Sequence, residues 1–201
     1  MVDIMKYNKI GLVYLFGSVY YVVAESISSI FFNDSLFNTY VFHTISELGI
    51  PNINSPLSFL MNSAFILIGL TLICGNFIEL KDYVVKNKNL FYIFTMITSL
   101  GVIIVGLIHG GNPLTSGYHT LGAIMAILGG NLLMLIISKS MNDFDNFQKV
   151  TCILGLIGLI SFWIMFFNLS NMFMPVFERL SVYTMIIWNF LTGVIILKRV
   201  I

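Results

Sequence analysis

Charged residues are scarce in this chain. Only 9% of its 201 residues are Asp, Glu, Lys or Arg, whereas 58% are hydrophobic. Soluble globular domains carry about 25% charged residues, and a mean hydropathy of +0.94 lies outside their range. The scarcity of charge therefore excludes a soluble globular protein and indicates an integral membrane protein.

Cysteine, proline and excess charge of either sign are also rare. The two cysteines, Cys74 and Cys152, fall inside predicted helices, where neither suggests a structural disulfide or a C-x-x-C motif. The four prolines interrupt none of the expected spans, which argues against a transporter built on broken helices. A net charge of +1 gives no reason to expect a nucleic-acid partner.

Six apolar segments are long enough to cross a hydrocarbon core at a rise of about 1.5 Å per residue. They cover residues 10–32, 57–79, 90–109, 118–138, 150–169 and 180–197. The first is too long for a signal peptide and lacks a convincing cleavage site, so we expect a retained helix. Little chain remains for a soluble domain. We therefore expect residues 1–201 to form one all-α membrane domain, a compact bundle of six transmembrane helices.

Basic residues predict how this bundle is oriented. Nine of the ten lie near the termini or in the connections after the second and fourth segments, and the exception is Arg179, expected in the loop before the last helix. Loops rich in Lys and Arg stay in the cytoplasm. We expect a multi-pass protein of the cell membrane with cytoplasmic N- and C-termini.

The longest connection on the expected external side joins the first two spans. Apolar residues between Leu36 and Leu48 are spaced as in a short amphipathic helix lying in the membrane interface. His43, Ser46 and Glu47 belong to this segment, and we expect them near water and lipid headgroups.

Glu25 is the clearest carboxylate inside a predicted span. An isolated charge in hydrocarbon costs several kcal/mol, so Glu25 should face a partner or a cavity, or be protonated. Alternatively, Glu25 only forms a hydrogen bond to a neighbouring helix and so contributes to helix packing without any further role.

Two of the three histidines flank one Gly- and Pro-containing turn. His109 ends the third predicted span and His119 begins the fourth, so both should lie at the same end of the bundle. Gly122, Ala126 and Gly130 follow His119 at helical spacing, and such small residues allow helices to approach closely. We expect this stripe to face protein, and the two imidazoles to come close together, although separate contacts with headgroups are the alternative.

Several short motifs resemble a known family. They are I-S-E-L-G from Ile45, the S-P-L-S-F-L-M-N-S-A-F-I-L-I-G run from Ser55, G-L-I-H-G and H-T-L-G-A around the two histidines, and E-R-L before the last span. With these motifs the chain resembles, over nearly its whole length, the prokaryotic membrane proteins grouped as domain of unknown function 998. The resemblance implies a compact six-helix membrane protein and supplies no activity for any residue.

Polar candidates gather in the expected outer half of the bundle: Glu25, His43, Ser46, Glu47, Asn62, His109, His119, Glu178 and Arg179. This distribution favours an outward-facing pocket that binds a lipid headgroup, a small ligand or a membrane-protein partner, including a second copy of the chain. The alternative is a metal-dependent intramembrane hydrolase acting on a lipid at the external leaflet. In that enzyme His43, His109 and His119, with a carboxylate, would bind a zinc ion that activates water. The sequence identifies no catalytic residue.

Overall fold

The computed structural model describes residues 2–52, 54–141, 145–167 and 172–198, excepting the side chains of residues 2–9. Its six long helices are α1 (Val2–Ile30), α4 (Ser58–Ile78), α5 (Lys88–Leu107), α6 (Ser116–Ser138), α7 (Asp145–Phe167) and α8 (Met174–Lys198). Each contains a stretch long and apolar enough to cross a membrane. No β-strand occurs in these ranges, so the expected all-α bundle of six spans is confirmed.

Helix α8 begins earlier than its apolar run. Pro175 lies in its first turn, where the missing N–H is not needed and the fixed φ suits a helix. Glu178 and Arg179 therefore lie inside α8, and the expectation that Arg179 belongs to the preceding loop was wrong. Helix α5 ends at Leu107, so His109 lies in the turn beyond it. Residues 168–169 of the fifth predicted span are outside the described residues.

The connection between α1 and α4 contains two short helices instead of the single expected one. They are α2 (Leu36–Phe42) and α3 (Ile45–Leu48). The hydroxyl of Thr44 accepts a hydrogen bond from the Glu47 N–H at 3.1 Å, which starts a new helix with Thr44 in an extended conformation. The spacing of apolar residues alone predicted one helix here, and the N-cap at Thr44 divides it into two.

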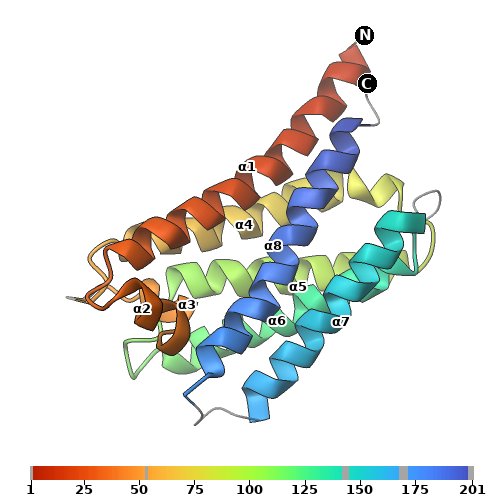
Figure 1. The fold of residues 1–201 in the computed structure, drawn as a ribbon. Coiled ribbons are helices and arrows are strands. Elements are labelled where there is room, and N and C mark those ends of the chain that lie inside the picture. The colour runs from red at the N-terminus through yellow and green to blue at the C-terminus, as the bar shows by residue number, and fades with distance from the viewer. Residues whose placement is uncertain (1, 53, 142–144, 168–171, 199–201) are drawn as a thin grey trace.

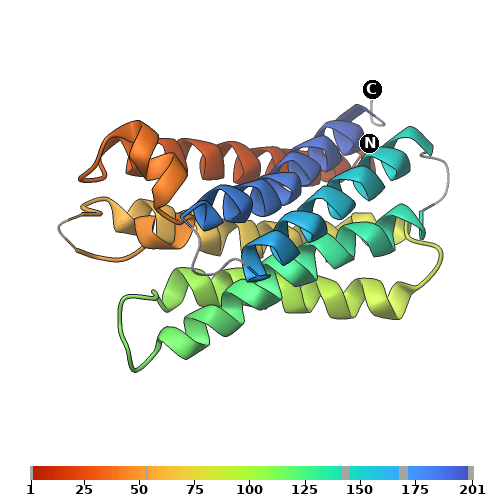
Figure 2. The same ribbon diagram turned by 60° about the horizontal axis from the view of Figure 1, so that its bottom comes forward.

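Neighbouring helices in sequence are neighbours in space. Contacts run α1–α4–α5–α6–α7–α8, and α8 closes the ring by packing on α1 (Figure 1). The turn η1 (Leu80–Asp82) follows α4. Both termini lie at one end of the bundle, and α2 and α3 lie at the other (Figure 2). We call these the terminal end and the α2–α3 end.

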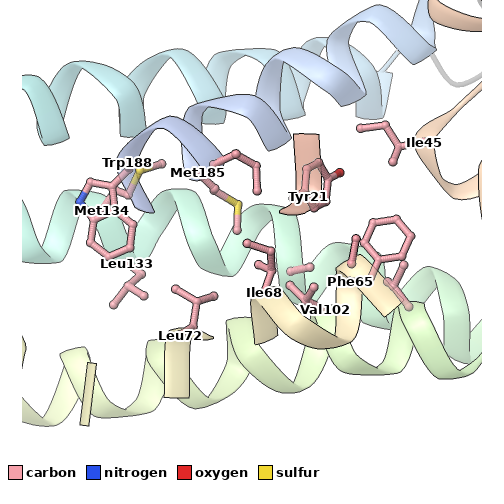
Figure 3. Packing of buried hydrophobic residues seen from close by; sticks show 14 of the residues in the cluster. Tyr21, Ile45, Phe65, Ile68, Leu72, Val102, Leu133, Met134, Met185 and Trp188 are labelled. Carbon is pink, nitrogen blue, oxygen red and sulfur yellow. The ribbon is translucent and has the colours of Figure 1, made fainter. Parts of the chain in front are cut away.

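The interior combines apolar packing with close helix contacts. Side chains of α4, α6 and α8, including Leu72, Leu133 and Trp188, meet inside the ring (Figure 3). A Cβ on Gly101 of α5 would lie 2.5 Å from the backbone nitrogen of Ala126, so α5 and α6 pack backbone to backbone. The stripe of small residues on α6 therefore faces protein, as expected.

Buried polar groups in mid-bundle bond to one another between helices. The Tyr14 hydroxyl donates to Asn76 Oδ1 at 2.5 Å, and Asn76 Nδ2 donates to Thr95 Oγ1 at 3.0 Å, which connects α1, α4 and α5. Asn131 Nδ2 donates to Ser181 Oγ at 3.0 Å between α6 and α8. Satisfied amides of this kind hold spans together where water is absent.

Candidate ligand pocket at the α2–α3 end

A buried ion pair joins the first and last helices. Arg179 Nε of α8 donates to Glu25 Oε1 of α1 at 3.1 Å, and the Tyr183 hydroxyl donates to the same oxygen at 2.9 Å. Glu25 is 1% exposed and Arg179 is 3% exposed. The expectation that Glu25 faces a polar partner is confirmed, and the partner is Arg179.

Arg179 also holds the end of α2. Its Nη1 donates to the carbonyl oxygens of Tyr40 at 3.1 Å and His43 at 2.5 Å. The guanidinium carbon lies 4.9 Å from the centre of the Tyr40 ring, a cation–π distance. These contacts satisfy carbonyls at the C-terminal end of a short helix, so Arg179 fixes α2 against α8.

Glu178, the preceding residue, holds α3. Its Oε2 accepts a hydrogen bond from the backbone N–H of Ile45 at 2.8 Å, and its Oε1 accepts one from the Ser46 hydroxyl at 3.4 Å. Successive residues of a helix point about 100° apart, which is why Glu178 and Arg179 reach different partners. Together they attach both short helices to α8.

A pocket opens beside α3, between α6, α7 and α8. Its outer part, which we call the entrance, has a volume of about 270 Å³. An inner cavity of about 40 Å³ lies within the ring of helices. The two parts share Ser46, Ala123, Ile127 and Glu178 in their walls, so they lie next to each other.

The inner cavity is apolar except at its α2–α3 end. Phe65, Val102 and Met185 line it, and the Tyr21 ring lies among them with its hydroxyl towards Ile45 (Figure 3). Tyr21 is 1% exposed, and its hydroxyl has no hydrogen-bond partner among the described residues. A cavity that admits about 10 to 15 Å³ can hold a water molecule, so this volume has room for a polar group of a ligand.

His119 lies in the wall of the entrance. Its Nδ1 is 2.6 Å from the carbonyl oxygen of Ile108. A carbonyl only accepts hydrogen bonds, so Nδ1 carries the proton and a neutral His119 has Nε2 as an acceptor. His109 follows Ile108 but lines neither part of the pocket, and its Nδ1 is buried without a partner in the described chain. The close approach of the two imidazoles stays a prediction.

His43, Glu47 and Asn62 serve the scaffold around the pocket. His43 lies between two carboxylates, with Nδ1 2.6 Å from Glu47 Oε2 and Nε2 3.2 Å from Asp34 Oδ2. Hydrogen bonds from Asn38 and from the Ser35 N–H, with His43 nearby, hold the pKa of Asp34 below its usual range. Asn62 Nδ2 donates to the Gly49 carbonyl at 2.8 Å, which binds the end of α3 to α4.

The zinc site of the alternative interpretation needs the three histidines in one group of ligands. No group of three or more His, Cys, Asp or Glu side chains able to hold a metal ion occurs among the described residues. His43 is engaged by Asp34 and Glu47, whereas His119 is on α6 and His109 is in the turn before it. Zinc chemistry accordingly has no ligand set in this part of the chain, and the hydrolase interpretation has no supporting geometry.

Three tyrosines of this region were not among the site candidates drawn from the sequence. Tyr183 bonds to Glu25, Tyr40 lies under Arg179, and Tyr21 reaches the inner cavity. Helical spacing held a signal for two of them, because Tyr183 follows Arg179 by one turn and Tyr21 precedes Glu25 by one turn. Aromatic residues are common in apolar spans, so that signal was weak.

The fold defines a multi-pass membrane protein with six helices capable of spanning a bilayer. The chain belongs to the family described as protein of unknown function, DUF998, whose match covers residues 17–195. The family resemblance of the sequence motifs is thereby confirmed. No curated protein and no solved structure matches the chain.

Proposed function

We propose that the protein binds a membrane lipid, which enters between α6, α7 and α8 and places its polar part near Glu178 and His119. The observation that carries this proposal is that the entrance and the inner cavity adjoin, with the buried Glu178 in the walls of both. Sites of this kind combine a mostly apolar wall with a few convergent polar groups.

The composition of the entrance supports an amphipathic occupant. Phe162, Met165 and Phe166 of α7 supply apolar wall, while Ser46, His119 and Glu178 supply polar atoms at the α2–α3 end. A fully polar ligand would make no apolar contacts with the α7 side chains, and a hydrocarbon would offer no polar group to Glu178. A lipid satisfies both parts.

Lateral access also supports a lipid. Helix α6 contributes exposed Thr120 to the entrance, so the pocket opens at the side of the bundle. In a protein whose six long helices can span a bilayer, lipid is the surrounding solvent at such an opening.

Topology decides which leaflet supplies the lipid. Lys81, Lys86, Lys139 and Lys149 lie in or next to the connections at the terminal end, whereas the buried Arg179 belongs to the α2–α3 end. Under the positive-inside rule the termini are cytoplasmic, and the pocket opens to the external leaflet of the cell membrane. A membrane-protein partner or a second copy of the chain is the competing occupant.

Photo-crosslinking tests the proposal. The purified protein is reconstituted in nanodiscs that contain a phospholipid with a diazirine on its acyl chain, and lipid adducts are mapped by mass spectrometry. Wild type should give adducts on α6 and α7 side chains of the entrance. Ala123→Phe, which fills the shared wall, and Thr120→Phe, at the mouth, should lower this labelling several-fold.

Leu121→Phe on the same helix is the matched control. Leu121 is 53% exposed, is absent from both parts of the pocket and should leave entrance labelling unchanged. Size-exclusion profiles report whether each variant folds. Wild-type labelling of the entrance in both Ala123→Phe and Thr120→Phe would refute the lipid pocket.

A further inference from the structure

The buried ionisable groups at the α2–α3 end do not pair one to one. Two carboxylates, Glu25 and Glu178, and one guanidinium, Arg179, are at least nine-tenths buried there. Arg179 forms its ion pair with Glu25. No ion pair to Glu178 occurs within the described chain, and its hydrogen-bond partners are the neutral Ile45 N–H and the Ser46 hydroxyl.

Glu178, the buried carboxyl group without an ion pair, borders the pocket. Glu178 contributes to the walls of both the entrance and the inner cavity. A buried carboxylate loses hydration and is stabilised by a cation placed beside it. Neither wall contains Lys or Arg among the residues described, so a cation that pairs with Glu178 inside the pocket would come from the ligand.

The other polar atoms of the pocket are suited to accept hydrogen bonds. With its Nδ1–H held by the Ile108 carbonyl, a neutral His119 in the wall of the entrance keeps Nε2 as an acceptor. Tyr21 lines the inner cavity, and its buried hydroxyl has no hydrogen-bond partner in the described residues, so the oxygen has free lone pairs. A primary ammonium has three N–H donors, whereas a quaternary ammonium has none.

We infer that the ligand of this pocket is an amphiphile with a protonated primary amine, bound through an ion pair with Glu178. This inference rests on the proposed lipid pocket and names its substrate class. The ammonium lies at the junction of the two parts, with Glu178 as its counter-ion and the hydrocarbon chain against Phe162 and Phe166. Neither wall contains a cation that would pair with a phosphate there, so an aminophospholipid would keep its phosphate outside the junction.

Binding of tritiated dodecylamine tests the inference. The protein is placed in phosphatidylcholine nanodiscs at pH 7, and binding is read by scintillation proximity after subtraction of empty nanodiscs. Wild type should prefer dodecylamine over dodecyltrimethylammonium and 1-dodecanol by at least about tenfold, which corresponds to one charge-assisted hydrogen bond. Equal competition by all three amphiphiles would overturn the inference.

Glu178→Gln is the decisive variant. Its amide oxygen still accepts from the Ile45 N–H, and its amide NH2 takes the place of the oxygen beside Ser46, where it can donate to the hydroxyl oxygen, so α3 stays attached while the charge is removed. This variant should lose at least about tenfold in dodecylamine affinity. Glu47→Gln removes the same charge from the same end but lines neither part of the pocket, and it should bind as wild type does.

These experiments distinguish failure of the primary-amine inference from failure of the proposed lipid pocket. Unchanged dodecylamine binding by Glu178→Gln, together with crosslinking that Ala123→Phe abolishes, would reject the amine and keep the lipid pocket. Crosslinking of the entrance that is unchanged in both Ala123→Phe and Thr120→Phe would reject the lipid pocket itself. Replacing phosphatidylcholine by phosphatidylethanolamine distinguishes the two sources of the amine: competition identifies an aminophospholipid, and its absence identifies a single-chain amine.

Discussion

Arg179 of α8 is bound to Glu25 of α1 through an Nε–Oε1 contact of 3.1 Å, although the two residues are 154 positions apart. The same guanidinium holds the carbonyls of Tyr40 and His43. Arg179 thus links α8 to α1, which closes the ring of helices, and it also holds α2 in place at the α2–α3 end.

Removal of Arg179 should be costly. Arg179→Met leaves Glu25 buried without its cation, and breaking one side of such a pair costs about 3 to 5 kcal/mol. Denaturant unfolding in detergent measures the loss, and Lys86→Met at the exposed terminal end should change stability by less than about 0.5 kcal/mol. The double variant Glu25→Leu/Arg179→Met should be more stable than Arg179→Met alone. A double variant destabilised by the sum of the single losses would contradict the pairing.

Tyr183 should contribute through its hydroxyl alone. Tyr183→Phe removes the donor to Glu25 Oε1 at 2.9 Å and keeps the ring, so we expect a loss of about 1 to 2 kcal/mol in unfolding free energy. Tyr118→Phe is the control, because Tyr118 is 64% exposed and its change should be near zero. Equal effects of the two substitutions would show that the Tyr183 hydrogen bond is not stabilising.

The α5–α6 contact should not tolerate a methyl group. A Cβ on Gly101 would lie 2.5 Å from Ala126 N and 2.7 Å from Gly122 O, and backbone atoms cannot move aside cheaply. Gly101→Ala should therefore lower stability by about 1 to 3 kcal/mol. Gly117→Ala is the matched control, since nothing lies within 4 Å of its added Cβ. Thermal unfolding of both variants in one detergent tests this, and an unaffected Gly101→Ala would mean that α5 and α6 are further apart.

Cysteine labelling tests the topology. Leu114→Cys in the α5–α6 turn should react with an impermeant maleimide added to intact cells, and Lys86→Cys in the α4–α5 connection should react only after permeabilisation, both in a background without Cys74 and Cys152. Lys86 is preferable to Asn87, whose left-handed φ of 51° favours asparagine. The reverse pattern would place the pocket on the cytoplasmic side.

Asp34 should make the protein more sensitive to acid. Its pKa is lowered in the folded protein, first by the Asn38 side chain and then by the Ser35 N–H. A lowered pKa gives stability that is present above the unfolded value of about 3.9 and is lost as pH falls through the folded value. Between pH 5 and pH 3, the melting temperature of wild type should fall more than that of Asp34→Asn. Asp82→Asn at the other end is the control, and parallel pH profiles for wild type and Asp34→Asn would contradict the assignment.

Local patterns carried enough information for the architecture. Apolar segments of sufficient length predict helices wherever they occur in the chain, because in a bilayer each backbone N–H and C=O must be satisfied within its own segment. The Gly122, Ala126 and Gly130 stripe indicated a protein-facing side of α6 for the same local reason. Helix ends were less predictable: Pro175 started α8 before its apolar run, and Thr44 divided the segment between Leu36 and Leu48.

The sequence by itself determined which residues needed polar partners, since a carboxylate such as Glu25 cannot lie in hydrocarbon alone. Only the tertiary structure decided who those partners are. The pairing of Glu25 with Arg179, and the attachment of α3 to Glu178, follow from the packing of α8 on α1 and from the position of α3. Those contacts depend on distances between helices far apart in the chain, and no local pattern encodes them.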